Sequence, residues 1–470
     1  MRTRLVLGGA AAAMAAVVAV VVVNAGLNGS VRGRAAASVA AVPSATAVAA
    51  PGATVGAAAG DVLPGLGRNA PVPTAAGLQR SLAPLLAAAG LGAAVSVQVV
   101  DVSSGNTLLS VNPGARLVPA STAKLLTGTA ALATAGPSAT LRTRVVDGVT
   151  AGEIVLVGGG DVLLGAGKGN PGAVVGHAGL ADLADATATA RKARGHTSVA
   201  VRLDDTLFRG PAVSPAWSPG DVVAGYVAPV MALEVDAGQV LRRAARQSDP
   251  AQAAGQVFAT LLAKRGITVT APVARASAPA SASELASVES APVADLVEYA
   301  LTESDNTVAE ALARIVALRM GRQATFTDGG RAVLDKVALL GVPTDGDALV
   351  GGSGLADGSA VSVRTLPSLL SLAGSSAHPE LRAVLSGLPV AGASGTLADR
   401  FASATQQGGL GAVRAKTGTL KGVNALAGVV VDVDGRLLAF AILADKTGST
   451  GAARTALDDV AVALAHCGCR

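Results

Sequence analysis

The feature that most constrains the fold is a two-residue hairpin signal near the end of the chain, Asp434-Gly435. It separates two apolar runs, 423–433 and 436–444, whose composition is typical of buried strands. A third such run, 412–417, precedes them. Strands joined by so short a turn pair antiparallel. The pattern therefore predicts an antiparallel unit, followed by a closing helix over about 451–466.

A second hairpin is predicted near residue 100. Residues 93–102 (AAVSVQVVDV) indicate a strand, 103–106 a turn and 107–111 the partner strand. A helix is expected to begin at Ser121, directly after Pro119-Ala120. Strands from both ends of the sequence are therefore expected to share one antiparallel sheet with helices packed on it, which is an α+β fold.

The N-terminal 76 residues predict export rather than a folded domain. Two arginines precede an uncharged apolar run, so 1–23 is expected to be an export signal or membrane anchor. The run is long for a signal peptide and just long enough to span a bilayer, which leaves cleavage open. A buried core helix is the alternative. The segment 24–76, rich in Ala, Val, Pro, Gly and Ser, predicts a flexible linker, with ordered structure beginning near Leu78.

The remaining length predicts two parts. Residues 77–142 and 291–470 are expected to form the main domain. The stretch 143–290, rich in Gly, Asp and short apolar runs, is expected to be an inserted domain. It contains none of the motifs described below, so we assign it no chemistry and expect a linker replacement to leave the main domain functional.

Charge and ligand-type residues exclude several classes of function. The net charge is only +5, without dense Lys/Arg runs and interleaved aromatic residues, so nucleic-acid binding is not expected. None of the four histidines is spaced as a metal ligand, and neither HExxH nor CxxC occurs, so no metal site is expected. A disulfide between Cys467 and Cys469, across one intervening residue, is possible but strained, and we expect a C-terminal tail with no catalytic role.

Ser121-Thr-Ala-Lys124 is the first candidate catalytic motif. Residues three apart share a helix face, so the amine can reach the hydroxyl. Burial and a helix N-terminus would lower the lysine pKa and make it a base for Ser121. Lys124 is the only lysine with a serine three positions before it.

Ser304-Asp-Asn306 is the second candidate, placed before an amphipathic run over 308–318. A serine hydroxyl and an asparagine amide there could relay a proton and hold a substrate amide. The same three residue types are also preferred at helix N-caps, so an ordinary cap is the alternative interpretation.

Lys416-Thr417-Gly418-Thr419 is the third candidate, at the expected end of a strand. An ammonium group and two hydroxyls could bind a carboxylate, and the glycine would let a substrate approach. A solvated strand end is the alternative. Lys446-Thr-Gly448 repeats part of the motif, but no strand follows it, so we discount it.

In this order, SxxK, SxN and KTG resemble the signature of penicillin-binding proteins and serine β-lactamases. The chain is similar to the low-molecular-mass class C penicillin-binding proteins, the D-alanyl-D-alanine carboxypeptidase/endopeptidase family, which carry a large insertion between the first two motifs. Further stretches that look like the family's own are Gly158-Gly-Gly-Asp161, Asp205-Thr-Leu-Phe208, Pro215-Ala-Trp217, Tyr226-Val-Ala-Pro229 and Ala415-Lys-Thr-Gly-Thr-Leu420.

One stretch departs from the family pattern. The family has Asp-Gly-Ser-Gly-Leu-Ser, often followed by Arg, where this chain has Gly351-Gly-Ser-Gly-Leu-Ala356 and then Asp357. The departure puts recognition of the third stem residue in doubt, but not the acyl-transfer chemistry.

The resemblance implies a penicillin-binding/β-lactamase-like transpeptidase fold, with an antiparallel sheet, an all-helical part and a large insertion. It also implies serine-type D-Ala-D-Ala carboxypeptidase and D,D-endopeptidase activity on peptidoglycan stem peptides in the extracytoplasmic cell envelope. β-Lactams would be covalent inhibitors, and no metal or organic cofactor is needed. The catalytic residues would be Ser121, Lys124, Ser304, Asn306 and Lys416, with substrate bound by Thr417, Gly418 and Thr419.

Two alternatives stay open. A serine β-lactamase would need a deacylating base, and none of the glutamates lies in an ExxLN sequence. A non-catalytic wall-binding protein with a vestigial site would not need all three motifs intact. The sequence does not decide the balance of carboxypeptidase and endopeptidase action, the diamino acid of the stem, or the oligomeric state.

Overall fold

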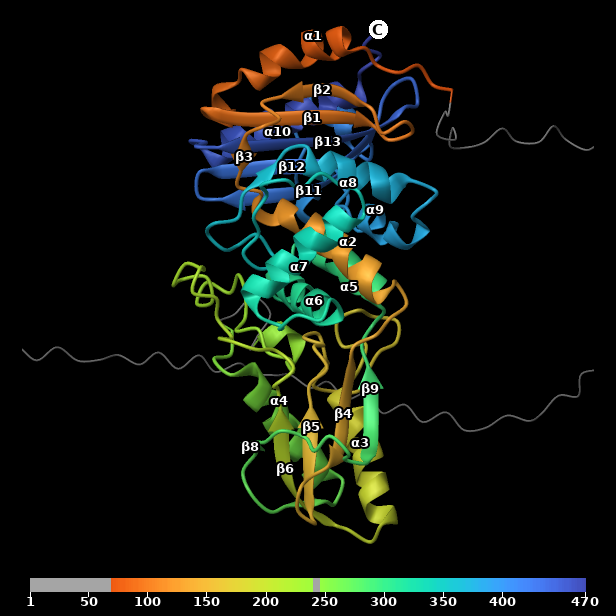
Figure 1. The fold of residues 1–470 in the computed structure, drawn as a ribbon, viewed down its shortest axis with the longest axis vertical. Coiled ribbons are helices and arrows are strands. Elements are labelled where there is room, and N and C mark those ends of the chain that lie inside the picture. The colour runs from red at the N-terminus through yellow and green to blue at the C-terminus, as the bar shows by residue number, and fades with distance from the viewer. Residues whose placement is uncertain (1–68, 240–245) are drawn as a thin grey trace, which may run out of the picture. The chain divides into compact units, whose positions relative to one another are not determined.

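The computed structural model describes residues 69–239 and 246–470 (Figure 1). The predicted export segment 1–23 and most of the predicted linker 24–76 lie outside the described residues. The first helix among the described residues is α1 (Ala75–Leu86), which buries Leu78 and Leu82 completely. Within the described ranges, no helix is both long and apolar enough to cross a membrane.

The main sheet joins strands from both ends of the chain, as predicted. Its order is β11 (Val413–Leu420), β12 (Val423–Val431), β13 (Leu437–Asp445), β1 (Ala94–Asp101) and β2 (Thr107–Val111), and every neighbouring pair is antiparallel. Both predicted hairpins are confirmed. Strand β11 runs further than expected, so the Lys416–Thr419 motif lies inside the strand rather than at its end.

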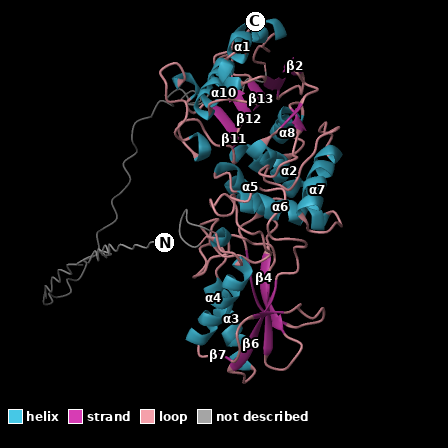
Figure 2. Ribbon diagram, turned by 90° about the vertical axis from the view of Figure 1, so that its left-hand side faces the viewer, coloured by secondary structure: helices cyan, strands magenta, loops and turns pink. Residues whose placement is uncertain are grey.

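Helices cover both faces of this sheet (Figures 1 and 2). On one face, α1 and α10 (Thr450–Ala465) pack against β-strand residues such as Phe440 in one apolar cluster. On the other face lies α8 (Thr365–Gly374), followed by an all-helical part. That part consists of α2 (Ala123–Ala135), α5 (Val293–Thr302), α6 (Asn306–Arg319), α7 (Phe326–Leu339) and α9 (Ala383–Ser386). A short pair, β3 (Arg116–Leu117) with β10 (Val361–Ser362), borders it.

The predicted insertion, 143–290, contains a second sheet with its own apolar cluster. It is formed by β4 (Arg142–Asp147), β5 (Glu153–Val157), β6 (Ser198–Asp204), β7 (Thr268–Val269), β8 (Ala274–Arg275) and β9 (Glu284–Glu289), with helices α3 (Leu180–Ala193) and α4 (Pro250–Lys264). Strands β4 and β9 pair directly, with Arg142 opposite Glu289. The chain therefore enters and leaves this sheet at adjacent points.

Part of the same stretch packs on the all-helical part instead. Phe208 and Trp217 belong to the apolar cluster of α2, α5, α6 and α7. The Trp217 ring meets the Phe326 ring edge-on at 4.9 Å between centroids. The guanidinium of Arg314, on α6, lies 3.9 Å from the Phe326 ring and donates to the carbonyl of Val230 over 3.1 Å. Residues 205–239 are therefore continuous with the core that carries the site.

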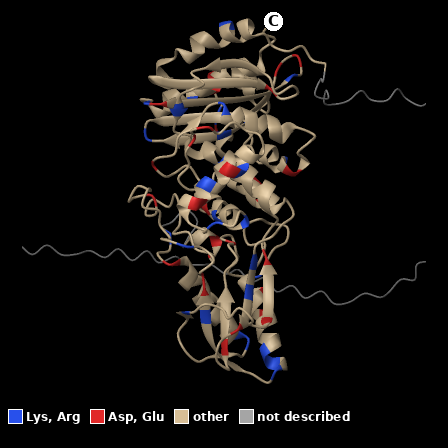
Figure 3. Ribbon diagram, viewed as in Figure 1, with Lys and Arg blue, Asp and Glu red and all other residues tan. Residues whose placement is uncertain are grey.

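The C-terminal tail is held to the start of the folded chain. Cys467 and Cys469 form a disulfide with their Cα atoms 4.9 Å apart. The carbonyl of Cys469 accepts a hydrogen bond from the Thr74 amide at 2.7 Å, next to the first residue of α1. This contact ties the tail to the N-terminal end of α1. Charged residues of both signs are interspersed over the described elements (Figure 3).

Candidate active site

The Ser121 motif lies where a short 3₁₀ turn (Ala120–Thr122) leads into α2. The Nζ of Lys124 is 2.9 Å from the Oγ of Ser121, as the three-residue spacing predicted. Ala120, just before the serine, has a left-handed φ of 45°. Such backbone strain is common where a reactive side chain must be presented in a fixed direction.

Two further oxygens surround the Lys124 amine. The Oδ1 of Asn306 lies at 2.6 Å and the carbonyl oxygen of Ser353 at 3.0 Å. Lys124 is almost completely buried, and this burial lowers its pKa to about 7, against the opposing attraction of Asp305 and Glu310. Neither carbonyl can donate a hydrogen bond, so a neutral amine gives them its two N–H groups. Its lone pair then faces the Ser121 hydroxyl.

The Ser304–Asn306 motif occupies the turn between α5 and α6. Asp305 caps α6, and its Oδ1 accepts from the Val308 amide at 2.9 Å. The N-cap interpretation thus holds for Asp305 alone. Ser304 has a left-handed φ of 57° and lines the same cavity as Ser121. The Nδ2 of Asn306 donates to the carbonyl of Tyr226 at 2.9 Å, which fixes the amide orientation that aims Oδ1 at Lys124.

The KTG motif alternates along β11, as strand geometry requires. Lys416 points inward and is fully buried, and its Nζ donates to the Thr417 carbonyl at 3.1 Å. Burial, together with the nearby charge of Lys124, holds the pKa of Lys416 well below its ordinary value. Thr417 and Thr419 face the opposite way and line the cavity. Gly418 faces the Ser121 turn, because a Cβ there would lie 2.7 Å from the Pro119 carbonyl oxygen. Its small size therefore serves the approach of β11 to this turn.

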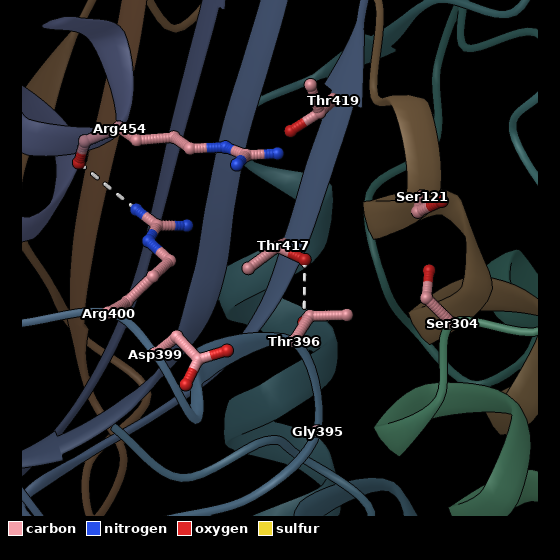
Figure 4. A pocket seen from close by; sticks show the side chains of 9 residues that line it. All are labelled: Ser121, Ser304, Gly395, Thr396, Asp399, Arg400, Thr417, Thr419 and Arg454. Atoms are coloured by element: carbon pink, nitrogen blue, oxygen red, sulfur yellow. Dashed lines mark hydrogen bonds between the residues drawn. The ribbon is translucent and has the colours of Figure 1, made fainter. Parts of the chain in front are cut away.

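A cavity of about 400 Å³ gathers residues from the three motifs (Figure 4). Its lining comprises Ser121, Ser304, Gly395, Thr396, Asp399, Arg400, Thr417, Thr419 and Arg454. The hydroxyl of Thr417 donates to that of Thr396 over 2.8 Å. Lys446 does not line this cavity, and its carbonyl oxygen packs against Gly92 instead.

Sequence reasoning missed several residues of the site. The stretch that departs from the family pattern supplies Ser353, whose carbonyl accepts from Lys124. Glu310 holds this stretch, because its carboxylate accepts from the amides of Gly352 and Ser353 at 2.9 and 3.0 Å. The departing Asp357 touches the stretch 205–239, since its amide donates to the Ala216 carbonyl at 2.9 Å. No local motif marks Glu310 or Arg454.

Among the described residues, no group of three or more His, Cys, Asp or Glu side chains is placed to hold a metal ion. The chemical groups at the site are hydroxyls, guanidinium groups and the Asp399 carboxylate of the cavity lining, together with the Lys124 amine beside Ser121. A serine beside a desolvated amine is the arrangement of an activated nucleophile.

Known proteins resemble this chain over most of its length. The profile of the D-Ala-D-Ala carboxypeptidase 3 (S13) family matches residues 78–248 and 241–466. Carboxypeptidase Rv3627c of Mycobacterium tuberculosis is 38% identical over 407 residues, which cover 85% of this chain and 86% of that protein.

The fold also matches solved structures. Penicillin-binding protein 4 of Haemophilus influenzae superimposes with a TM-score of 0.67 at 21% identity, covering 82% of this chain and 97% of that one. The same protein complexed with a β-lactam superimposes with a TM-score of 0.62 and the same coverage. These matches confirm the expected α+β transpeptidase-like fold.

Proposed function

Because the chain belongs to the D-Ala-D-Ala carboxypeptidase 3 (S13) family and is such a carboxypeptidase, we propose that it cleaves peptidoglycan stem peptides through an acyl-enzyme on Ser121. The observation that carries this proposal is the Lys124 amine, buried, 2.9 Å from the Ser121 hydroxyl and with its pKa lowered to about 7. At neutral pH a large share of this amine is unprotonated and can accept the serine proton.

Acylation proceeds as follows. Lys124 takes the proton of Ser121 as its Oγ attacks the carbonyl carbon of the penultimate D-alanine. The backbone N–H groups of Ser121 and Thr419 hold the oxyanion. The C–N bond then breaks, and the amine of the terminal D-alanine leaves with a proton delivered through Ser304 and the lysine amines. Water then hydrolyses the acyl ester and restores the serine.

The other site residues hold the substrate and the base. Thr417 and Thr419 offer hydroxyls to the terminal carboxylate from β11, which supports their role in binding. The Asn306 side chain accepts a hydrogen bond from the Lys124 amine and so orients it. We assign Asn306 a second role, which is to bind the amide group of the substrate's acyl chain. The buried amine of Lys416, lying beneath this strand, completes the proton path.

The same chemistry accounts for β-lactam sensitivity and for endopeptidase action. A β-lactam offers a strained amide to the same serine, and the neighbour solved with a β-lactam bound supports this assignment through its shared fold. Cross-linked stems contain a D-alanyl amide as well, so D,D-endopeptidase activity needs no new groups. We place the enzyme in the extracytoplasmic envelope, exported by residues 1–23, because its substrate is the cell wall.

A direct test uses purified protein, a synthetic stem pentapeptide and cross-linked muropeptides, with products identified by mass spectrometry. We expect release of the terminal D-alanine and cleavage of the D-alanyl cross-link, and neither with Ser121→Ala. Lys421→Ala, which changes an exposed lysine beyond β11, is the matched control and should act as wild type. A protein that turns over penicillin rapidly and leaves both peptides intact would be a β-lactamase instead.

A further inference from the structure

The cavity contains one arginine whose charge is not used by the protein itself. Arg454 lies on α10, and its side chain points toward Thr419 in Figure 4. Only its backbone carbonyl is engaged, by the guanidinium of Arg400 at 3.1 Å. Within residues 69–239 and 246–470, no hydrogen bond or ion pair engages the Arg454 guanidinium. This group is therefore available to a ligand.

The other cationic groups of the site are already committed. Arg400 forms a two-point pair with Asp458, with Nη2–Oδ1 at 2.6 Å and Nε–Oδ2 at 3.2 Å, and both side chains are largely buried. Lys124 and Lys416 are buried, and burial lowers the pKa of each. A guanidinium keeps its charge at every physiological pH. Arg454 thus supplies the one permanent, uncompensated positive charge among the residues that line this cavity.

The Arg454 charge shares the cavity with the two threonine hydroxyls that we assign to carboxylate binding. Thr417 and Thr419 line the same cavity as Arg454. Hydroxyls can donate to a carboxylate or to an amide oxygen alike, so they do not distinguish the two. A guanidinium favours a carboxylate, because it pairs opposite charge with a planar two-point fit. The carboxylate of Asp399 also lines the cavity, and Figure 4 shows it below Arg400, on the side of Gly395, whereas the Arg454 guanidinium extends towards Thr419.

We infer that Arg454 binds the free carboxylate of the leaving residue and makes the enzyme discriminate against substrates in which that carboxyl group is amidated. This inference rests on the proposed function. It assigns the charge preference to α10, whereas the KTG strand supplies hydrogen bonds that either form of substrate can use. For cross-links whose leaving residue carries a carboxyl group beside its amine, the same arginine distinguishes the free from the amidated form.

The experiment compares two peptides, diacetyl-L-lysyl-D-alanyl-D-alanine and its C-terminal carboxamide. For each we measure kcat/KM of cleavage at the D-alanyl bond by wild type, Arg454→Gln, Arg454→Lys and Arg414→Gln. Arg414 lies on β11 and is exposed, outside the lining of this cavity, which makes it a matched control. Acylation by benzylpenicillin and by its carboxamide repeats the comparison without requiring turnover.

We expect Arg454→Gln to lower kcat/KM on the free peptide about 10- to 100-fold, the usual effect of a hydrogen bond to a charged group. The carboxamide should change less than about threefold, Arg454→Lys should recover part of the preference, and Arg414→Gln should match wild type. If Arg454→Gln leaves the ratio of kcat/KM for the free peptide to kcat/KM for the carboxamide unchanged, the inference is overturned. An equal loss of kcat/KM on both peptides would be such a result. If wild type cleaves neither peptide and no β-lactam acylates it, the proposed function itself fails.

Discussion

The Lys124 amine is surrounded by three oxygens, and only the Ser121 hydroxyl can donate a hydrogen bond to it. Burial lowers the pKa of Lys124 to about 7, so the basic form is present above that pH and lost below it. We predict that the rate of acylation by benzylpenicillin falls about tenfold per pH unit below 7 and levels off above it. Stopped-flow measurement from pH 5 to 9 checks this, with the fold monitored by circular dichroism. A rate that keeps rising towards pH 10 would mean that the lysine keeps its ordinary pKa.

Glu310 acts on the same amine from a distance. Its carboxylate accepts from the Gly352 amide, the Ser353 amide and the Ser353 hydroxyl, the last at 2.5 Å, while the Ser353 carbonyl accepts from Lys124. The negative charge also raises the pKa of Lys124, against the larger lowering by burial. Glu310 is therefore a positioning residue.

We predict that Glu310→Gln lowers the acylation rate about tenfold or more, because an amide cannot accept from all three donors. The midpoint of the pH profile should also move to lower pH, since a charge that favours protonated Lys124 is gone. Glu298→Gln is the control: this half-buried carboxylate on α5 accepts from the Ser386 hydroxyl and not from the 351–354 loop, so rate and midpoint should stay unchanged. A loss of rate with a fixed midpoint would reduce Glu310 to a purely structural role.

At the scale of elements, the sequence predicts those features that depend on neighbouring residues. The hairpin at Asp434-Gly435 and the three-residue spacing of Ser121 and Lys124 are local, and both are found as expected. The length of β11 was underestimated because Gly418 interrupts its apolar pattern, yet the glycine is needed where β11 meets the Ser121 turn. Contacts of Ser353 with Lys124 join residues 229 positions apart, and no local pattern encodes them.

The loop 351–354 packs against the start of α2, and Gly354 is the residue in contact. A Cβ at Gly354 would lie 1.9 Å from the carbonyl oxygen of Ala120, and its φ of 76° is left-handed. We predict that Gly354→Ala displaces the Ser121 turn, lowers the acylation rate more than about tenfold and lowers Tm.

Gly358→Ala is a matched control for this change. Its φ of 91° is also left-handed and imposes similar backbone strain on an alanine, about 1–2 kcal/mol, but the nearest atom to an added Cβ is a Val350 methyl at 3.4 Å. Gly358→Ala should lower Tm and leave the acylation rate near that of wild type. Equal rates for the two variants would mean that the Gly354 contact does not set the position of the serine.

At the scale of the whole molecule, the stretch 143–290 forms a second sheet and also contacts residues of the active site. The carbonyl of Tyr226 orients Asn306, and the Ala228 amide donates to the Thr307 hydroxyl at 3.0 Å. The sequence alone suggested that a linker could replace this stretch without loss of acylation. The contacts of 205–239 reverse that expectation, because removing them frees the Asn306 amide and uncovers the core of α6.

We therefore predict that the linker replacement abolishes acylation. Since such a protein can also fail to fold, Arg314→Met provides a milder version. It removes the hydrogen bonds from α6 to the carbonyls of Val230 and Pro211, and should cost about 2 kcal/mol in urea unfolding together with part of the acylation rate. Arg319→Gln, an exposed change on the same helix, should do neither. Full acylation of the linker variant would show that 205–239 is dispensable.

The measurement that tests the account most directly is the location of the covalent adduct. The protein is treated with benzylpenicillin, digested and mapped by mass spectrometry, alongside Ser121→Ala. Ser121 is the hydroxyl that faces the Lys124 amine at 2.9 Å, so we predict one penicilloyl group on the peptide containing Ser121 and none in the variant. An adduct on Ser304, which lines the same cavity, or labelling that survives Ser121→Ala would contradict the assignment of the nucleophile.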